Sequence, residues 1–259
     1  MKPAWHSLEG RTALVAGASR GIGLAIAREM ARAGARTILA ARSLEKLEAE
    51  AAQLRQQGFE AQALRLDISD AASIQAAVNA APPVDVLVVV AGINLRKRFL
   101  DYTREEYETL MRTNLHGPVE LVRAVGRGMI ERGRGGKIIL IGSMMTILGL
   151  PYMVPYALAK SALGGLTHAL AAEWAQHNIQ VNAILPGFIL TDLTQPVWAR
   201  PEMQAWLRGI LPAGRLGTPE EIAPLAVFLA GPGADYITGQ LIAVDGGYST
   251  CAVWPLQPA

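Results

Sequence analysis

The fold is decided by Thr12-Ala13-Leu14-Val15-Ala16-Gly17-Ala18-Ser19-Arg20-Gly21-Ile22-Gly23. The first five residues are typical of a buried strand, and helical periodicity starts at Gly21. The glycines between them permit a tight turn and a close backbone approach. A strand, a glycine turn and a helix in this order can hold a pyrophosphate on backbone N–H groups. The spacing is a variant of the dinucleotide fingerprint, and a βα turn without a ligand is the alternative.

Strand-like runs and helical patterns alternate along the rest of the chain. The expected strands are 12–16, 36–41, 61–66, 84–90, 136–142, 179–185 and 238–244, and the expected helices are 21–33, 43–57, 70–80, 103–131, 152–177 and 219–230. Runs that are apolar on both faces are typical of parallel strands buried between two helix layers. We expect an α/β fold, a single domain over 1–259 with a doubly wound parallel sheet of about seven strands, of the Rossmann type.

The segment at about 188–213 interrupts this alternation with three prolines and two tryptophans. An insertion of this length in an α/β protein often covers a binding site, so we expect a substrate lid. In open parallel sheets, ligands bind beyond the carboxyl ends of the strands. The residues that directly follow expected strand ends, and should converge there, are Gly17, Asp67, Ala91, Ser143 and Pro186.

Tyr156 and Lys160 lie four residues apart, which places both side chains on one face of a helix. A lysine ammonium beside a phenol lowers a pKa that is ordinarily about 10, so Tyr156 could act as a general acid or base. Ser143 stands thirteen residues earlier at a strand end, where its hydroxyl could polarise a substrate carbonyl. A helix cap or a turn is the alternative role for Ser143.

The glycine loop, Asn114, Ser143, Tyr156-x-x-x-Lys160 and Pro186-Gly187 occur in the order and spacing of one known family. From about Leu8 to Tyr248 the chain resembles the short-chain dehydrogenases/reductases. The resemblance implies hydride transfer between a nicotinamide cofactor and a secondary alcohol or ketone. It further implies that Ser143 orients the substrate oxygen, Tyr156 transfers the proton and Lys160 holds the ribose. Asn114 would support a relay water, with a structural hydrogen bond as its alternative.

The choice of cofactor is indicated at the end of the second expected strand. No carboxylate stands there to bind the ribose 2′-hydroxyl of NAD(H). Arg42 and Arg20 instead offer guanidinium groups suited to a 2′-phosphate, although Arg42 could simply be solvated. We therefore favour NADP(H) over NAD(H). Asp67 matches the family position that accepts from adenine, with a helix cap as its alternative and Asp70 as the better cap.

The expected cofactor site combines these residues with their neighbours in the matching motifs. Its members are Gly17, Ser19, Arg20, Ile22, Gly23, Arg42, Asp67, Ile68, Ala91, Gly92, Tyr156, Lys160, Pro186, Gly187, Ile189 and Thr191. One departure from the family stands beside them. Where the family usually carries Asn-Asn-Ala-Gly, this chain has Val89-Val90-Ala91-Gly92, which puts the cofactor affinity or the local stability at issue.

Three stretches look most like the gluconate 5-dehydrogenase and sugar-acid branch of the family. They are Gly92–Lys97, Gly214–Pro219 and Val244–Tyr248. The resemblance implies a sugar acid or polyol such as gluconate or 5-ketogluconate, and a 3-oxoacyl-carrier-protein reductase or other ketone reductase is the alternative. Arg96 could pair with a substrate carboxylate, and Ser143 and Tyr156 complete the expected substrate site. A non-catalytic NADP-binding module is a remote alternative.

The composition favours a small-molecule partner. A net charge of +2 gives no electrostatic case for nucleic acid or a membrane, and the amino-terminal residues lack the apolar core of a signal peptide. We expect a cytoplasmic enzyme without a metal. We also expect a homotetramer, because long helical patterns and the end segment carry apolar residues on more than one side. Those residues include Leu163, Leu166, Leu170, Trp174 and Ala252-Val253-Trp254-Pro255-Leu256.

Overall fold

Seven parallel strands form one sheet in the order β3-β2-β1-β4-β5-β6-β7 in the computed structural model, which describes residues 4–192 and 194–252. The strands are β1 (Thr12–Ala16), β2 (Arg36–Ala41), β3 (Ala61–Arg65), β4 (Val86–Val89), β5 (Gly136–Ile141), β6 (Ile179–Pro186) and β7 (Leu241–Val244). The expected doubly wound α/β sheet is therefore confirmed. β7 begins at Leu241 rather than at 238, because Gly239 has a left-handed φ of 74°.

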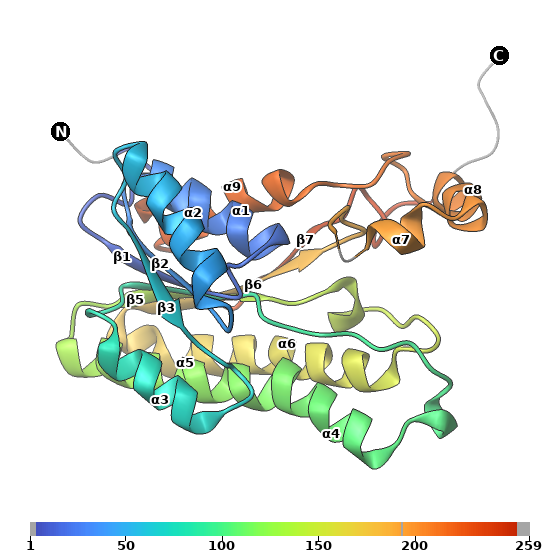
Figure 1. The fold of residues 1–259 in the computed structure, drawn as a ribbon, viewed down its shortest axis with the longest axis horizontal. Coiled ribbons are helices and arrows are strands. Elements are labelled where there is room, and N and C mark those ends of the chain that lie inside the picture. Colours follow the sequence, from blue (N-terminus) through green and yellow to red (C-terminus); the bar gives the residue numbers. More distant parts are fainter. Residues whose placement is uncertain (1–3, 193, 253–259) are drawn as a thin grey trace.

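Helices cover both faces of this sheet. They are α1 (Gly21–Arg32), α2 (Leu44–Gln56), α3 (Ala71–Ala80), α4 (Arg104–Met111), α5 (Gly117–Arg132), α6 (Val154–Trp174), α7 (Gln195–Trp198), α8 (Pro201–Ile210) and α9 (Pro219–Ala230). Figure 1 shows α1, α2 and α9 on one face and α3, α4, α5 and α6 on the other. Alternate residues of β1 supply the two cores, Val15 toward α1 and α9 and Leu14 toward α5 and α6.

The long helix expected over 103–131 is not continuous. A π-helical turn, η2 (Arg112–His116), separates α4 from α5. Pro118 accounts for part of this break, because proline has no N–H to donate to the carbonyl of Asn114 four residues earlier. Single π turns inside helices are frequent at functional sites, and this turn carries Asn114.

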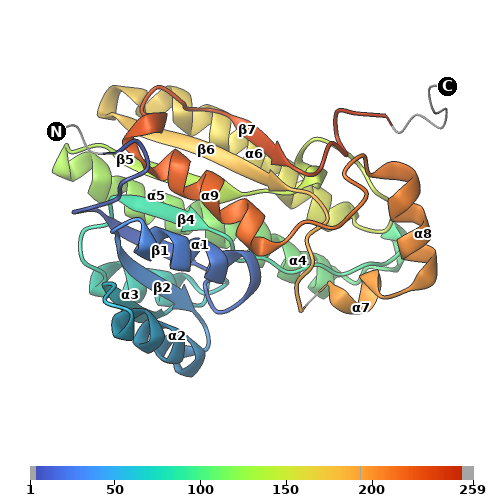
Figure 2. The ribbon, with the colours of Figure 1, turned by 90° about the horizontal axis from the view of Figure 1, so that it is seen from above.

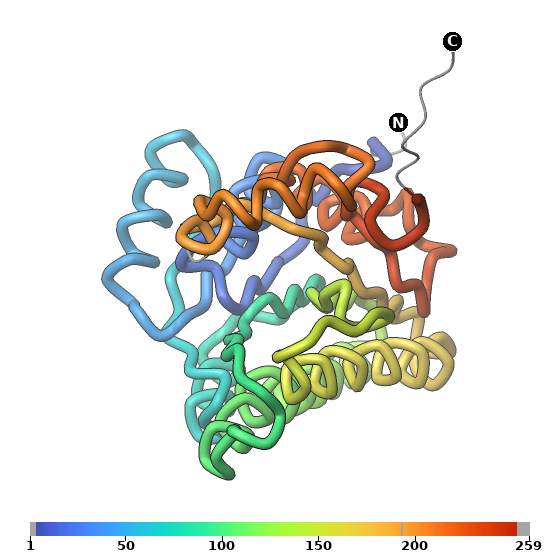
Figure 3. Tube along the Cα trace, turned by 90° about the vertical axis from the view of Figure 1, so that its right-hand side faces the viewer, coloured from blue at the N-terminus to red at the C-terminus, as the bar shows by residue number. Residues whose placement is uncertain are grey.

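The 188–213 segment folds into a packed unit that holds α7 and α8. Trp198, Leu207 and Leu211 are buried in a small core of their own, against which Phe188 and Tyr248 pack. Figure 2 places α7 and α8 beyond the carboxyl ends of β6 and β7, and Figure 3 shows this segment across the end of the sheet from α6. The segment therefore lies at the end of the sheet where ligands of this fold class bind.

Two residues that we expected at subunit contacts are inside the protomer. Leu163 and Trp174 are only 2% and 7% exposed and belong to the core beneath the sheet. Leu166 and Leu170 pack against the same core and are partly covered. Leu163 and Trp174 therefore do not supply the free apolar surface on which the tetramer expectation partly rested. Residues 253–256 of the apolar end segment lie outside the described part of the chain.

Gly126 makes the contact between α5 and α6 possible. A Cβ at this position would lie 2.4 Å from the indole of Trp174, whereas a Cβ at Gly128 would meet only the end of the Arg132 side chain at 3.4 Å. We expect Gly126→Ala to destabilise the protein by about 1–3 kcal/mol through overpacking. Gly128→Ala on the same helix should be neutral or stabilising by up to about 1 kcal/mol. Thermal melting of both variants checks this, and equal melting temperatures would contradict it.

Candidate active site

The glycine loop after β1 folds back on itself at the carboxyl end of the sheet. Gly17 has a φ of 99°, and a Cβ there would lie 2.7 Å from the backbone nitrogen of Ala91. A Cβ on Gly23 would lie 2.2 Å from the carbonyl oxygen of Gly17. α1 starts at Gly21, and its N-cap residue Arg20 makes no side-chain cap. The first-turn N–H groups of α1 therefore suit an anion such as a pyrophosphate.

The chain after β6 returns to this loop. A Cβ on Gly21 would lie 3.5 Å from the methyl group of Thr191, and Ile189 bridges to Gly217. Among the expected cofactor residues, the structure places at this end of the sheet Gly17, Ser19, Arg20, Ile22 and Gly23, then Ala91 and Gly92, and then Pro186, Gly187, Ile189 and Thr191. These residues come from three separate stretches of the sequence, as the strand-end argument predicts.

Arg42 follows β2 and Asp67 follows β3, so both lie on the opposite side of β1 from Ser143, Tyr156 and Lys160. The Asp67 carboxylate accepts from the backbone N–H and the hydroxyl of Ser69, at 2.9 and 2.7 Å. This contact, together with the charges of Arg42 and Arg65, lowers the pKa of Asp67 despite its partial burial. Asp70, not Asp67, caps α3 by accepting from Ala72, as expected. Arg65, which we did not single out, brings further positive charge to this end of the site.

Asn114 is fully buried in the π turn, and its amide is paired with both backbone groups of Ile93. The Oδ1 atom accepts from the Ile93 N–H and the Nδ2 atom donates to the Ile93 carbonyl, both at 2.8 Å. The structural hydrogen bond that we named as the alternative is therefore present. The side-chain amide is therefore occupied. The backbone carbonyl of Asn114 receives no α-helical N–H, because residue 118 is a proline, so this carbonyl is the group of Asn114 that can accept a hydrogen bond from a water. The N-x-x-x-P spacing is the signal that sequence reasoning missed.

Lys160 is buried with Asn114 beneath Gly92. Its Nζ atom donates to the Ile141 carbonyl at 2.8 Å, and a Cβ on Gly92 would lie 3.7 Å from Nζ and 2.8 Å from the Oδ1 atom of Asn114. Burial lowers the pKa of Lys160 to about 8. Gly92 thus leaves room for both polar groups at the end of β4. Ile68, another expected cofactor residue, packs its carbonyl against Gly117 at the start of α5.

Ser143 follows β5 after one residue, Gly142, and caps the short helix η3 (Met144–Thr146). Its hydroxyl accepts from the Met145 N–H at 3.2 Å, while its own N–H donates to the Thr146 hydroxyl at 3.2 Å. The capping role that we held as the alternative is therefore real. The hydroxyl proton remains available for a second partner, because a serine hydroxyl both donates and accepts. The Ser143 hydroxyl also acts to lower the pKa of the Tyr156 phenol.

The pKa of the Tyr156 phenol is raised, whereas we expected Lys160 to lower it. Burial raises it above its ordinary value, although part of the ring reaches solvent, and the Ser143 hydroxyl and the charge of Arg96 oppose this effect. Lys160 is not among the groups that lower it. The Nζ atom lies 5.8 Å from the centre of the Tyr156 ring and donates to Ile141 instead. Arg96, on the loop after β4, is the cation whose field reaches the phenol.

Val89 and Val90 stand at the end of β4 where the family usually carries two asparagines, and both pack against apolar side chains. Val89 is 3% exposed in the core beneath the sheet, while Val90 packs against the core on the opposite face. The Val90 and Ala91 N–H groups both donate to the Ala16 carbonyl, at 2.9 and 3.1 Å. The strand end is therefore held in place without amide side chains. The effect of the two valines on cofactor affinity stays a prediction.

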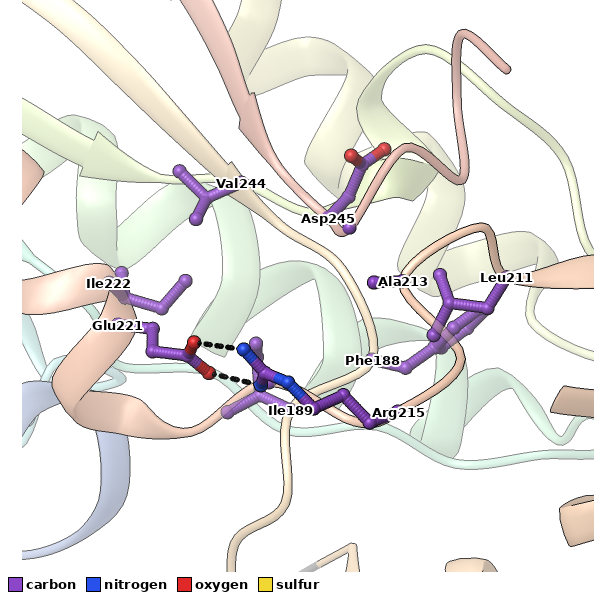
Figure 4. Close-up of a pocket in the computed structure, with 11 residues that line it drawn as sticks. Phe188, Ile189, Leu211, Ala213, Arg215, Glu221, Ile222, Val244 and Asp245 are labelled. Atoms are coloured by element: carbon purple, nitrogen blue, oxygen red, sulfur yellow. Dashed lines mark hydrogen bonds and ion pairs between the residues drawn. The ribbon is translucent and has the colours of Figure 1, made fainter. Parts of the chain in front are cut away.

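A cavity of about 90 Å³ lies beneath the 188–213 segment, between Phe188, Leu211 and Asp245 (Figure 4). The Arg215 guanidinium forms a bidentate pair with Glu221 at its edge, at 2.8 and 2.6 Å. None of Asn114, Ser143, Tyr156 and Lys160 lines this cavity. It is therefore a gap at the base of the segment rather than the reaction centre.

Two further features bear on the class of site. Within residues 4–192 and 194–252, no group of three or more His, Cys, Asp or Glu side chains is arranged to hold a metal ion. No helix in the described part of the chain has both the length and the apolar character needed to cross a membrane.

Comparisons with known proteins agree with this geometry. Residues 17–249 match the family model described as enoyl-(acyl carrier protein) reductase. The gluconate 5-dehydrogenase of Gluconobacter oxydans is 38% identical over 95% of this chain and 97% of its own length. The 3-oxoacyl-[acyl-carrier-protein] reductase of Pseudomonas aeruginosa is 42% identical over 93% and 98%. The crystal structure of a Burkholderia cenocepacia gluconate 5-dehydrogenase, in complex with NADP and tartrate, superposes with a TM-score of 0.92 at 37% identity, covering 95% and 98% of the two chains. The chain belongs to the short-chain dehydrogenase/reductase family.

Proposed function

We propose that the protein is an NADP(H)-dependent oxidoreductase that interconverts a secondary alcohol and a ketone in a sugar acid or polyol, such as gluconate and 5-ketogluconate. The observation that carries this proposal is that Ser143, Tyr156 and Lys160 come together near the end of β5, where the charge of Arg96 also acts to lower the pKa of the phenol. A hydroxyl, a phenol and a cation together can orient an alcohol and remove its proton.

Each side chain has a distinct part in this chemistry. When bound, the nicotinamide supplies or accepts the hydride. Ser143 donates its hydroxyl proton to the substrate oxygen and so fixes its position. Tyr156 takes the alcohol proton as the phenolate during oxidation, and as the phenol it donates a proton to the ketone oxygen during reduction. Lys160 and Asn114 lie next to Gly92. The Lys160 ammonium can hold the ribose hydroxyls, and the backbone carbonyl of Asn114 can hold a relay water.

NADP(H) is proposed over NAD(H) on the charges at the adenosine end. Arg42 is exposed beside Asp67, and Arg20 stands exposed in the glycine loop. Planar guanidinium groups bind a phosphate with two hydrogen bonds each, whereas NAD has no phosphate at this position. The Burkholderia relative that contains NADP supports the same choice.

A sugar acid is proposed because of Arg96 and the two gluconate-acting relatives. A guanidinium near the phenol can bind a substrate carboxylate while the hydroxyl to be oxidised faces Tyr156. The 42% identity with a 3-oxoacyl-[acyl-carrier-protein] reductase supports that reaction as the second candidate. Activity with acetoacetyl thioesters but none with gluconate would select the second candidate.

We also propose that residues 1–259 act as one domain in which the 188–213 segment closes over bound substrate. Its position beyond the ends of β6 and β7 supports this role. A homotetramer and a cytoplasmic location stay predictions. Exposed Ile147, Leu148 and Leu158 offer apolar surface for subunit contacts in place of the buried Leu163 and Trp174.

Tyr156→Phe tests the proposed reaction. The wild-type protein should reduce NADP in the presence of gluconate, seen as a rise in nicotinamide absorbance. The variant keeps the ring but loses the proton-transferring hydroxyl, so we expect turnover to fall by at least roughly 10²–10⁴-fold. The affinity for NADPH, measured by the change in its fluorescence on binding, should stay unchanged. Near-normal turnover in the variant would exclude Tyr156 as the acid or base.

Arg42→Ala tests the choice of cofactor. A charge-assisted hydrogen bond contributes about 1.5–3 kcal/mol, so the preference for NADP over NAD should fall by roughly 10- to 150-fold. Affinity for NAD should hardly change, because NAD lacks the 2′-phosphate. Arg42→Asp should reduce the preference further through repulsion. The measurement is kcat/KM for both cofactors, and a wild-type protein that prefers NAD would refute the assignment at once.

A further inference from the structure

The loop between β4 and α4 has little regular structure, yet several side chains fix its course. Asn114 binds both backbone groups of Ile93, and the Nδ2 atom of Asn94 lies 3.1 Å from the sulfur of Met153. Farther along, the Lys97 N–H donates to the Tyr152 carbonyl at 3.0 Å. The loop is therefore fastened to the turn that precedes α6, the helix that carries Tyr156.

Tyr102 completes this attachment from the far end of the loop. Its hydroxyl donates to the Leu95 carbonyl and also lies 3.2 Å from the Tyr152 carbonyl. We call these two contacts the Tyr102 bridge. A phenol has a single O–H donor, so the two carbonyls share it. The bridge joins the loop and the turn before α6 through a half-buried side chain that lies outside the family motifs.

The turn itself is held in an unfavourable conformation. Tyr152 has a φ of 69°, in the left-handed region that side chains disfavour, and its carbonyl receives both the Lys97 N–H and the Tyr102 bridge. Backbone strain of this kind persists only where the surroundings impose it, and it is concentrated near functional sites. Tyr152 stands four residues before Tyr156 on the chain, so the strained turn sets the entry to the catalytic helix.

Arg96 lies between the two fixed points of the loop. The preceding residue, Leu95, gives its carbonyl to Tyr102, and the following residue, Lys97, gives its N–H to Tyr152. Lys97 is further anchored by an ion pair with Glu106 on α4. The backbone on both sides of Arg96 is thus restrained, while its own side chain is exposed. The Lys97 contact ties this part of the loop to Tyr152, four residues before Tyr156, and the charge of Arg96 acts to lower the pKa of the Tyr156 phenol.

We propose that Tyr102 is a positioning residue that holds Arg96 where it can bind the carboxylate of a sugar acid. This inference rests on the proposed function. Tyr102 itself makes no contact with the substrate, and it acts by fixing the peptide groups on either side of Arg96. The bridge therefore selects acidic over neutral substrates without taking part in proton or hydride transfer.

The test measures binding, not turnover. Calorimetry with saturating NADPH reports the dissociation constant of gluconate, which this reduced complex cannot oxidise, and of sorbitol, a neutral polyol of equal length. We expect Tyr102→Phe to weaken gluconate binding by about 2- to 12-fold, the effect of one neutral hydrogen bond. Sorbitol binding should stay unchanged. Tyr107→Phe, which removes the hydroxyl of an exposed tyrosine on α4, should alter neither.

A double-mutant cycle shows whether Tyr102 acts through Arg96. Arg96→Ala should remove the preference for gluconate, and Tyr102→Phe should then have no further effect. A full effect of Tyr102→Phe in the Arg96→Ala background, or equal weakening of gluconate and sorbitol, would overturn the inference. A gluconate preference that Arg96→Ala removes but Tyr102→Phe leaves intact would overturn the inference alone. A wild-type protein with no preference for gluconate would overturn the proposed sugar-acid substrate and this role together.

Discussion

The pairing between the Asn114 amide and the backbone of Ile93 is the constraint on which the candidate site depends. Asn114 itself is fully buried, and both of its hydrogen bonds to Ile93 measure 2.8 Å. An unpaired amide in this position would have a large desolvation penalty, so the π turn and the end of β4 must keep their relative positions. Gly92 fits against the Asn114 amide only because it has no side chain. The loop that carries Arg96 starts from the same fixed point.

Burial shifts the pKa values of both Tyr156 and Lys160, and two nearby groups counteract this shift for Tyr156. Desolvation raises the pKa of Tyr156 and lowers the pKa of Lys160 to about 8. Either shift alone would favour the neutral side chain. The Ser143 hydroxyl and the charge of Arg96 act in the opposite direction on the phenol. Arg96, which we propose binds the substrate carboxylate, thus also acts to lower the pKa of Tyr156, an effect that the sequence spacing had led us to assign to Lys160.

Much of the fold follows from the sequence because buried parallel strands have a strong signature. Runs such as Val86–Val89 are apolar on both faces, and the glycine loop fixes the first βα turn. The break at η2 did not follow, because the helical periodicity continues across it and only Pro118 signals the change. The roles of Tyr102 and Arg65 were also missed. Their contacts join residues far apart in sequence, and no local pattern encodes such contacts.

The central claim is that this site transfers a hydride between NADPH and a sugar-acid ketone. NADPH deuterated at C4 of the nicotinamide, on one face or the other, would be incubated with 5-ketogluconate and the protein. Mass spectrometry of the product then locates the label. We predict that deuterium from one face alone appears on C5 of the product, and that Tyr156→Phe suppresses its appearance. Unlabelled product with both deuterated cofactors, or no product while NADPH is demonstrably bound, would contradict the account.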